Sequence, residues 1–215
     1  MTLDELAIRH NTDKGTTSGH ASTHGYAPFY DEHLKKWREE PIRLLEIGVC
    51  MEGTPGGQSV RMWYEYFSKA EIYAFDIVDM KSLENDRVKF LQGDQSDRAT
   101  LEAMYIEFGS KNFDFILEDG SHREDHQMVS FGHLFKYVKP GGYYILEDMS
   151  IPGQPACCIR NDKTYSVIKN FMETGKIDSE YITAEEKKYL EKNVAKIEIF
   201  TDIQNAYATA LITKK

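Results

Sequence analysis

The sequence has few cysteines and no long apolar run. Its three cysteines are Cys50, Cys157 and Cys158, an odd number in which two are adjacent. Because adjacent cysteines rarely pair with each other, we expect free thiols in a reducing cytoplasm. No stretch approaches the roughly 18 apolar residues that a membrane span requires. The sequence therefore predicts a cytoplasmic protein with no membrane partner.

Positive charge is also scarce. The chain of 215 residues has 26 Lys and Arg against 35 Asp and Glu, a net charge of −9, and a pI near 5.3. An acidic surface repels a phosphate backbone, so we expect no nucleic-acid partner. The first residues, MTLDELAIRHNTDKG, have early acidic side chains and no apolar core, and they predict no secretory signal.

Apolar runs alternate with helical patterns along most of the chain. The runs that read as strands are 42–48, 71–77, 88–94, 112–119, 143–148, 195–200 and 206–213. Helical spacing or capping predicts helices at about 3–9, 27–39, 55–67, 98–109, 123–137, 161–174 and 176–192. This alternation indicates an α/β fold, a Rossmann-like doubly wound sheet that is mostly parallel and carries an antiparallel C-terminal edge hairpin.

One domain accounts for the whole length, because 215 residues can bury a full core and no linker interrupts them. We divide it into an N-terminal lid and helical segment, 1–40, and a Rossmann-like core, 41–215. Residues 11–28 are rich in turn formers, and so long a loop is often a functional lid. Residues 149–160 form a second candidate loop, and 139–142 (KPGG) predict a sharp turn before the fifth strand.

Acidic residues at the ends of three successive predicted strands suggest a cofactor pocket. In an open α/β sheet, ligands bind at the carboxyl ends of the strands. Glu46 and Gly48 open a glycine-rich turn that is not G-x-G-x-x-G, which weakens a dinucleotide interpretation. Asp76 is positioned to accept hydrogen bonds from both ribose hydroxyls, and Gly93-Asp94-Gln95 lies where an adenine edge would sit. The alternative is that Glu46 and Asp76 only cap strand ends.

Two further strand ends predict a metal site with a base. Asp119 and Asp148 close neighbouring strands, so their carboxylates can converge on one ion, and hard oxygen ligands favour Mg²⁺. His122 follows Asp119 by three residues and titrates in the range useful to a general base. The alternative is that Asp119 caps a helix and His122 only packs there. His122 and His126 do not form a zinc-protease motif, because the glutamate after the first histidine is absent.

Four blocks in order resemble the class I S-adenosylmethionine-dependent methyltransferases. More closely, they resemble the bacterial metal-dependent sugar O-methyltransferases that tailor macrolide and other natural-product glycosides. The blocks are Thr12-Asp13-Lys14-Gly15 with His24-Gly25-Tyr26 and Tyr30; LLEIGV with GGQSVRMW; EDGSH; and KPGGYYILED. The resemblance implies an S-adenosylmethionine-dependent, Mg²⁺-assisted O-methyltransferase that acts on a hydroxyl of a sugar or glycosylated small molecule.

The resemblance also implies roles for single residues. The implied cofactor-binding residues are Glu46 and Gly48 (methionine portion), Asp76 (ribose), Asp94 and Gln95 (adenine), and Tyr26. The implied metal ligands are Asp119 and Asp148, and the implied base is His122. A third ligand stays open among Asp31, Glu32 and Glu147.

The acceptor and some alternatives also stay open. After the Glu147-Asp148 pair, relatives continue with an aromatic-containing substrate loop, whereas this chain has MSIPGQPACC. A glycosidic small-molecule acceptor is expected, and a homo-oligomer is possible. The alternative functions are a hydroxylase-type enzyme on the same scaffold, similar to cephalosporin-modifying proteins, and a non-catalytic nucleoside-binding domain.

Overall fold

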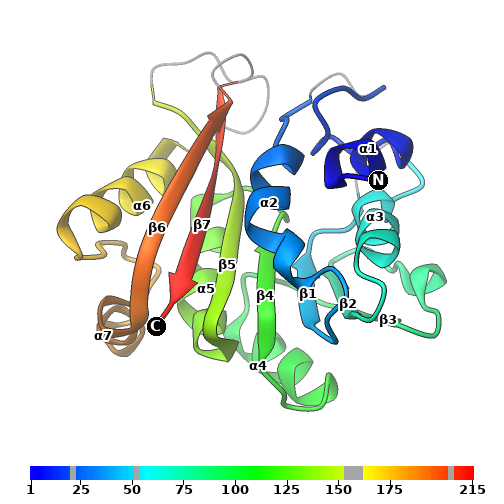
Figure 1. The fold of residues 1–215 in the computed structure, drawn as a ribbon. Coiled ribbons are helices and arrows are strands. Elements are labelled where there is room, and N and C mark those ends of the chain that lie inside the picture. Colours follow the sequence, from blue (N-terminus) through cyan, green and yellow to red (C-terminus); the bar gives the residue numbers. More distant parts are fainter. Residues whose placement is uncertain (20–22, 51–53, 153–161, 203–205) are drawn as a thin grey trace.

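A mixed sheet in the order β3-β2-β1-β4-β5-β7-β6 organises the chain (Figure 1). The computed structural model describes residues 1–19, 23–50, 54–152, 162–202 and 206–215. In these residues the strands are β1 Arg43–Ile47, β2 Glu71–Asp76, β3 Val88–Gln92, β4 Phe113–Glu118, β5 Val138–Ser150, β6 Val194–Asp202 and β7 Tyr207–Lys214. Strands β1 to β5 pair in parallel, β7 is antiparallel to β5, and β6 is antiparallel to β7. The predicted fold class is confirmed.

Helices cover both faces of the sheet (Figure 1). They are α1 Leu3–Arg9, α2 Ala27–Leu34, α3 Gln58–Tyr66, α4 Arg98–Glu107, α5 Glu124–Leu134, α6 Asp162–Thr174 and α7 Ala184–Asn193, with 3₁₀ turns at Lys35–Trp37, Lys81–Leu83 and Phe135–Tyr137. One core packs α1, α2 and α3 against β1 and β2. A second core packs α4 to α7 against the opposite face. Among the described helices, none has the length and apolar character needed to cross a bilayer.

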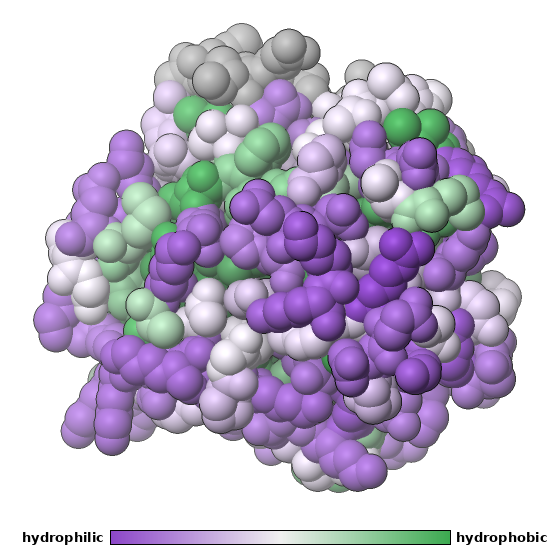
Figure 2. Space-filling view, viewed as in Figure 1, coloured by the Kyte–Doolittle hydropathy of each residue, from purple (hydrophilic) through white to green (hydrophobic). Residues whose placement is uncertain are grey.

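The C-terminal hairpin of β6 and β7 contacts α2 on the face seen in Figure 1. Phe200 of β6 stacks on Phe29 of α2, with ring centroids 5.4 Å apart. Of the described helices, none lies in front of β6 and β7 in this view. Figure 2 shows the same face as largely hydrophilic, with hydrophobic residues gathered over β5, β6 and β7.

Several element boundaries differ from those predicted. The predicted turn at 139–142 lies inside β5, where the pairing with β4 shifts between Phe113 and Phe115 and Gly141 has a φ of 75°. The predicted helix 176–192 was wrong in its first half: Thr183 caps α7 through a reciprocal bond pair with Glu186. Strand pairing with β4 therefore determines the structure of residues 139–142, although their composition is typical of a turn. The cap at Thr183 determines where α7 begins, although the charged residues before it are compatible with a helix.

Parts of the predicted loops and cysteines fall outside the described residues. The second predicted loop, 149–160, was wrong at its start, because residues 149 and 150 extend β5; residues 151 and 152 follow the strand, and 153–160 are not among the described residues. Cys50 is a free cysteine, whereas Cys157 and Cys158 lie outside the described part of the chain. In the first predicted loop, Thr12, Asp13 and Lys14 are buried. The part of this loop nearest α1 therefore packs against the rest of the protein.

Candidate active site

The ends of β1 and β4 meet in direct backbone contact. Asp119 donates its backbone N–H to the carbonyl of Ile47 at 2.8 Å. Gly48 has a φ of +83°, and a Cβ atom there would overlap the carbonyl oxygen of Asp119. Only glycine fits both the left-handed backbone and this close approach. As a result, the glycine-rich turn after β1 lies directly beside the EDGSH turn after β4.

A pocket lies at the carboxyl ends of the first strands, as predicted for a ligand site. It brings together four of the predicted cofactor residues: Gly48, Asp76, Asp94 and Gln95. The remaining lining residues are Ile47, Cys50, Phe75, Ile77, Val78, Gly93, Gly120, Ser121 and His126. Glu46 and Tyr26 do not line this pocket.

The Asp76 carboxylate holds the backbone around the pocket. One oxygen accepts hydrogen bonds from the N–H groups of Val49, at 2.7 Å, and Cys50, at 2.8 Å. The other accepts from the N–H of Val78 at 2.8 Å. A carboxylate has about four lone-pair sites, so one further bond can form there. Asp76 thus shapes the glycine-rich turn and retains limited capacity to accept a bond from a ligand hydroxyl.

Gln95 holds the EDGSH turn from the pocket side. Its side-chain oxygen accepts from the N–H of Ser121 at 2.9 Å, and its amide donates to Glu118 at 2.6 Å. A Cβ atom on Gly120 would overlap the same amide. Burial raises the pKa of Glu118 to about 7. The sequence resemblance implied that Gln95 contacts adenine. It did not indicate that Gln95 is also hydrogen-bonded to the turn that carries His122.

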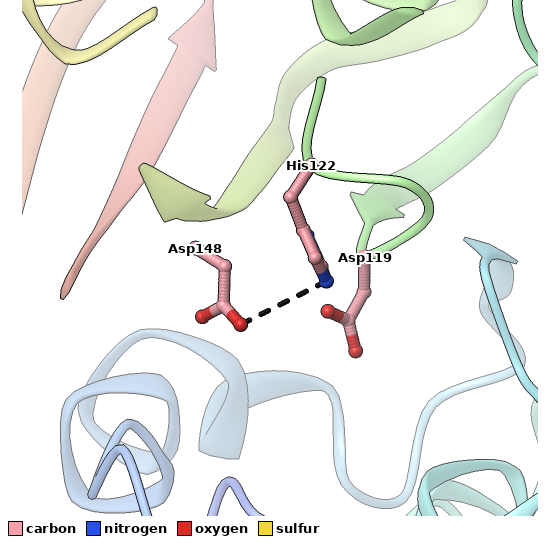
Figure 3. Close-up of side chains that lie close together, drawn as sticks. All are labelled: Asp119, His122 and Asp148. Atoms are coloured by element: carbon pink, nitrogen blue, oxygen red, sulfur yellow. Dashed lines mark ion pairs between the residues drawn. The ribbon is translucent and has the colours of Figure 1, made fainter. Parts of the chain in front are cut away.

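Asp119, His122 and Asp148 converge on one point beside the pocket (Figure 3). One ligand atom from each lies within 4.8 Å of the others. The imidazole Nε2 of His122 is 3.9 Å from an oxygen of Asp148. These three residues are the predicted metal ligands and the predicted base, so the structure brings them together.

The backbone at two of these residues is unusual. His122 has a φ of 56° and Asp148 a φ of 54°, values that non-glycine residues adopt rarely and at some energetic cost. At Asp148 the pairing of β5 with β7 shifts between Leu146 and Met149. Such an irregularity turns a side chain away from the regular alternation of a strand. It aims the Asp148 carboxylate at the cluster.

Residues from the N-terminal segment hold Asp148. The hydroxyl of Tyr26 donates to one carboxylate oxygen at 2.9 Å. The Nε2 of His24 is 3.4 Å from the other oxygen, and the rings of His24 and Tyr26 stack at 5.2 Å. Tyr26 is fully buried here. The structure places it at the carboxylate cluster, although the sequence resemblance had grouped it with the cofactor residues.

Lys14 joins the two central strands at the same place. Its ammonium group donates to Asp119 and to Glu147 at 2.9 Å, and its side chain is 1% exposed. Tyr30 donates to the other oxygen of Glu147 at 2.7 Å. Sequence reasoning missed Lys14, because a single lysine in a polar loop has no periodicity that places it. Its only signal was its position in the Thr12-Asp13-Lys14-Gly15 block.

The three candidates for a further ligand occupy different places. Asp31 accepts a hydrogen bond from Tyr66 at 2.5 Å, and Glu32 is exposed. Glu147 is buried beside Asp148, and both of its oxygens are engaged by Lys14 and Tyr30. Of the three, Glu147 alone adjoins the Asp119–His122–Asp148 cluster.

The charges in the cluster shift its ionisation. Burial lowers the pKa of His122, but the negative charges of Asp148 and Asp119 outweigh burial and raise that pKa overall. Burial raises the pKa of Asp119 despite the positive charge of Lys14. Two carboxylates that repel each other, with an imidazole nitrogen beside them, suit a divalent cation with oxygen and nitrogen ligands. The donor set therefore fits a metal ion.

Glu46 is a second buried acid beside this cluster. It is fully buried, and the side chains of Ser59 and Trp63 lie close enough to lower its pKa, although neither meets its carboxylate oxygens at full hydrogen-bonding geometry. Burial raises the pKa of Glu46 from 4.5 to about 7, although the charge of Lys14 opposes this shift. A buried carboxylate with only weak donors, one residue before the pocket-lining Ile47, favours a ligand that carries a cationic group.

Comparisons with known proteins identify related chains. Mycinamicin VI 2''-O-methyltransferase of Micromonospora griseorubida is 39% identical over 149 residues, which cover 68% of this chain and 36% of that protein. The 8-demethyl-8-(2-methoxy-alpha-L-rhamnosyl)-tetracenomycin-C 3'-O-methyltransferase of Streptomyces olivaceus is 37% identical over the same shares of both chains. No protein-family model matches the chain.

A solved structure with the same fold contains a metal and a nucleoside. The MycE methyltransferase from the mycinamycin biosynthetic pathway, in complex with Mg and SAH, aligns with a TM-score of 0.76 and 29% identity. The alignment covers 100% of this chain and 55% of MycE. The chain thus spans about half of this solved relative and a smaller share of the curated ones.

The buried state of Glu46 predicts a pH-dependent stability in the absence of any ligand. Between pH 4.5 and about 7 the folded chain keeps a proton on Glu46 that the unfolded chain releases. The contribution of Glu46 to the free energy of unfolding therefore falls as pH rises through this window, by on the order of 3 kcal/mol. Thermal or urea unfolding at pH 5 and pH 8 should show Glu46→Gln gaining stability relative to wild type at the higher pH.

The exposed Glu107 of α4 offers a matched control. The substitution Glu107→Gln should differ from wild type by the same amount at both pH values. If Glu46→Gln instead follows wild type across the whole range, Glu46 does not hold a proton in the folded chain.

Proposed function

Because this chain belongs to the class I S-adenosylmethionine-dependent methyltransferases, we propose that it methylates a hydroxyl of a sugar or glycosylated small molecule with the assistance of Mg²⁺. One observation carries this proposal: the Asp119–His122–Asp148 cluster lies directly beside the pocket at the strand ends. Similarity to sugar O-methyltransferases, and to MycE with Mg and SAH, supports the choice of cofactor and metal.

The pocket has groups suited to each part of S-adenosylmethionine. Asp76, which lines the pocket, could accept a bond from a ribose hydroxyl, and Asp94 and the exposed apolar Ile77 line the part of the pocket that would take an adenine. Gly48 and Gly120 leave backbone uncovered along the wall. The buried Glu46, at the end of β1 just before Gly48, would favour the cationic methionine end on that side of the pocket. When bound, S-adenosylmethionine supplies an electrophilic methyl group on a positively charged sulfur.

Asp119 and Asp148 would hold the metal ion, with Glu147 next to them. A divalent cation at such a site makes a neighbouring hydroxyl more acidic and fixes its orientation. Other residues of this chain keep the two carboxylates in position. Tyr26 and His24 keep Asp148 in place, and the backbone contact at Gly48 keeps Asp119 beside the pocket.

His122 is the proposed general base. As the acceptor oxygen attacks the methyl carbon, an oxygen–carbon bond forms, the carbon–sulfur bond breaks, and the hydroxyl proton passes to His122. The electron pair of the broken bond stays on sulfur, so neutral S-adenosylhomocysteine leaves. His122 must be neutral beforehand, and its position near Asp148 stabilises the imidazolium that results.

The acceptor is proposed only as a class. A sugar with neighbouring hydroxyls suits a cluster that can hold a cation and a base together. The similar enzymes act, by their names, on mycinamicin VI and on a rhamnosyl tetracenomycin. Residues 153–161, which follow Asp148 in sequence, lie outside the described part. A cytoplasmic location and a homo-oligomer stay predictions.

Loss of Asp148 should separate metal use from cofactor binding. We expect Asp148→Ala, or wild type in excess chelator, to lose methyl transfer, because the ion then has no second strand-end carboxylate. Binding of S-adenosylhomocysteine by calorimetry should persist in both, because the pocket does not include Asp148. Asp114→Asn, at the other end of β4, is the control and should keep activity. Full turnover in excess chelator would contradict a metal-assisted reaction.

Loss of His122 should lower turnover without changing binding. A positioned acid–base group contributes about 10²–10⁴-fold to a rate, so His122→Ala should lower kcat by that order while KM changes little. In wild type the rate should fall as the pH drops through the His122 pKa, because the protonated ring cannot accept a proton. The variant should lack this inflection.

His133→Ala is the matched histidine control, since His133 pairs with Glu102 on α4, outside the cluster. It should retain both the rate and the pH profile. A His122→Ala enzyme with near-normal kcat and an unchanged profile would mean that another group takes the proton.

A further inference from the structure

Lys14 links the ends of β4 and β5 from outside the sheet at the carboxylate cluster. It lies in the polar stretch between α1 and α2, yet its ammonium group donates to Asp119, after β4, and to Glu147, in β5. It is also 3.8 Å from Asp13. Its side chain is 1% exposed, so these carboxylates are its surroundings in place of water.

The backbone next to Lys14 carries the rest of the N-terminal segment to the same place. The carbonyl of Lys14 accepts from the N–H of Ala27 at 2.8 Å, and the carbonyl of Asp13 accepts from the N–H of His24 at 2.7 Å. This pairing sets His24 and Tyr26 beside Asp148. One lysine is therefore linked, directly or through its neighbours, to Asp119, Glu147 and Asp148.

The bond from Lys14 also fixes one oxygen of Asp119. Without a partner, the half-buried carboxylate of Asp119 and the buried one of Glu147 would repel each other, and their side chains would turn apart. An ammonium group between them removes that repulsion and holds one rotamer of each. In metal sites, partners behind the ligands determine ligand orientation in this way.

We propose that Lys14 is a positioning residue that docks the N-terminal segment, residues 12–19 and 23–30, onto the sheet and orients Asp119 for the metal ion. This inference rests on the proposed metal site. Lys14 touches neither acceptor nor cofactor in this role. It acts through Asp119 and Glu147, and through the segment that presents His24 and Tyr26 to Asp148.

Two measurements on Lys14→Met test the inference. The first is Mg²⁺ binding by calorimetry in the absence of cofactor, where loss of a partner behind a ligand should weaken binding by about 10- to 100-fold. The second is hydrogen–deuterium exchange, where peptides from residues 12–19 and 23–30 should exchange faster than in wild type. Lys139→Met is the matched control, because it removes a lysine–aspartate pair with Asp114 at the opposite end of β4; it should change neither measurement.

Each outcome has a separate meaning. If wild type itself binds no Mg²⁺, the proposed function fails, whereas wild-type-like binding in Lys14→Met overturns only this inference. Tighter binding in the variant also overturns it, because Lys14 would then be a competing cation. If Lys14→Met does not fold, Glu147→Gln is measured in its place. This variant removes one of the negative charges that the Lys14 ammonium contacts, so residues 12–19 should exchange faster than in wild type. Unchanged exchange in that variant contradicts the docking role.

Discussion

Repulsion among buried carboxylates is the constraint on which this structure depends. The buried Glu46, Glu147 and Asp148 and the half-buried Asp119 lie at the carboxyl edge of β1, β4 and β5, and Asp13 approaches them from the N-terminal segment. Removing such groups from water is costly unless charges or donors compensate. The fold meets this cost with Lys14, with the hydroxyls of Tyr26 and Tyr30, and with the imidazoles of His24 and His122. Negative charge is left over, and that surplus makes the edge suited to cations.

The same edge explains why the cofactor pocket and the metal cluster adjoin. The contact of Gly48 with Asp119 leaves no room for a side chain between the two turns. Gln95 then ties the pocket floor to the EDGSH turn through Ser121 and Glu118. A methyl donor and an acceptor must meet within a few ångströms, so two turns in backbone contact meet the geometric demand of group transfer.

Much of the fold could be predicted from the sequence, because strands and helices of a parallel sheet follow local periodicity. The convergence of Asp119 and Asp148 could also be predicted, since neighbouring parallel strands end at the same edge. The place of Lys14 could not, because its partners lie 105 and 133 residues away in the chain. Tyr26 shows the same limit: its motif was visible, but its partner depends on how a polar loop folds back.

Boundaries were least predictable where tertiary contacts override composition. β5 extends to Ser150 because β7 pairs with it beyond Asp148, and the segment before Thr183 is not helical although it is rich in charge. Ile177 and Ile182 in that segment are buried. Both side chains pack in the core although the segment is not helical. No pattern in the sequence indicates that they are buried.

The most direct test of the account is a crystal structure of the protein grown with Mn²⁺ and S-adenosylhomocysteine. The anomalous signal of manganese locates the ion independently of any assumption about its ligands. The account predicts a peak between the carboxylates of Asp119 and Asp148, within reach of His122, with the nucleoside in the adjoining pocket beside Asp76. A peak at any other site, or a nucleoside bound away from that pocket, would contradict it.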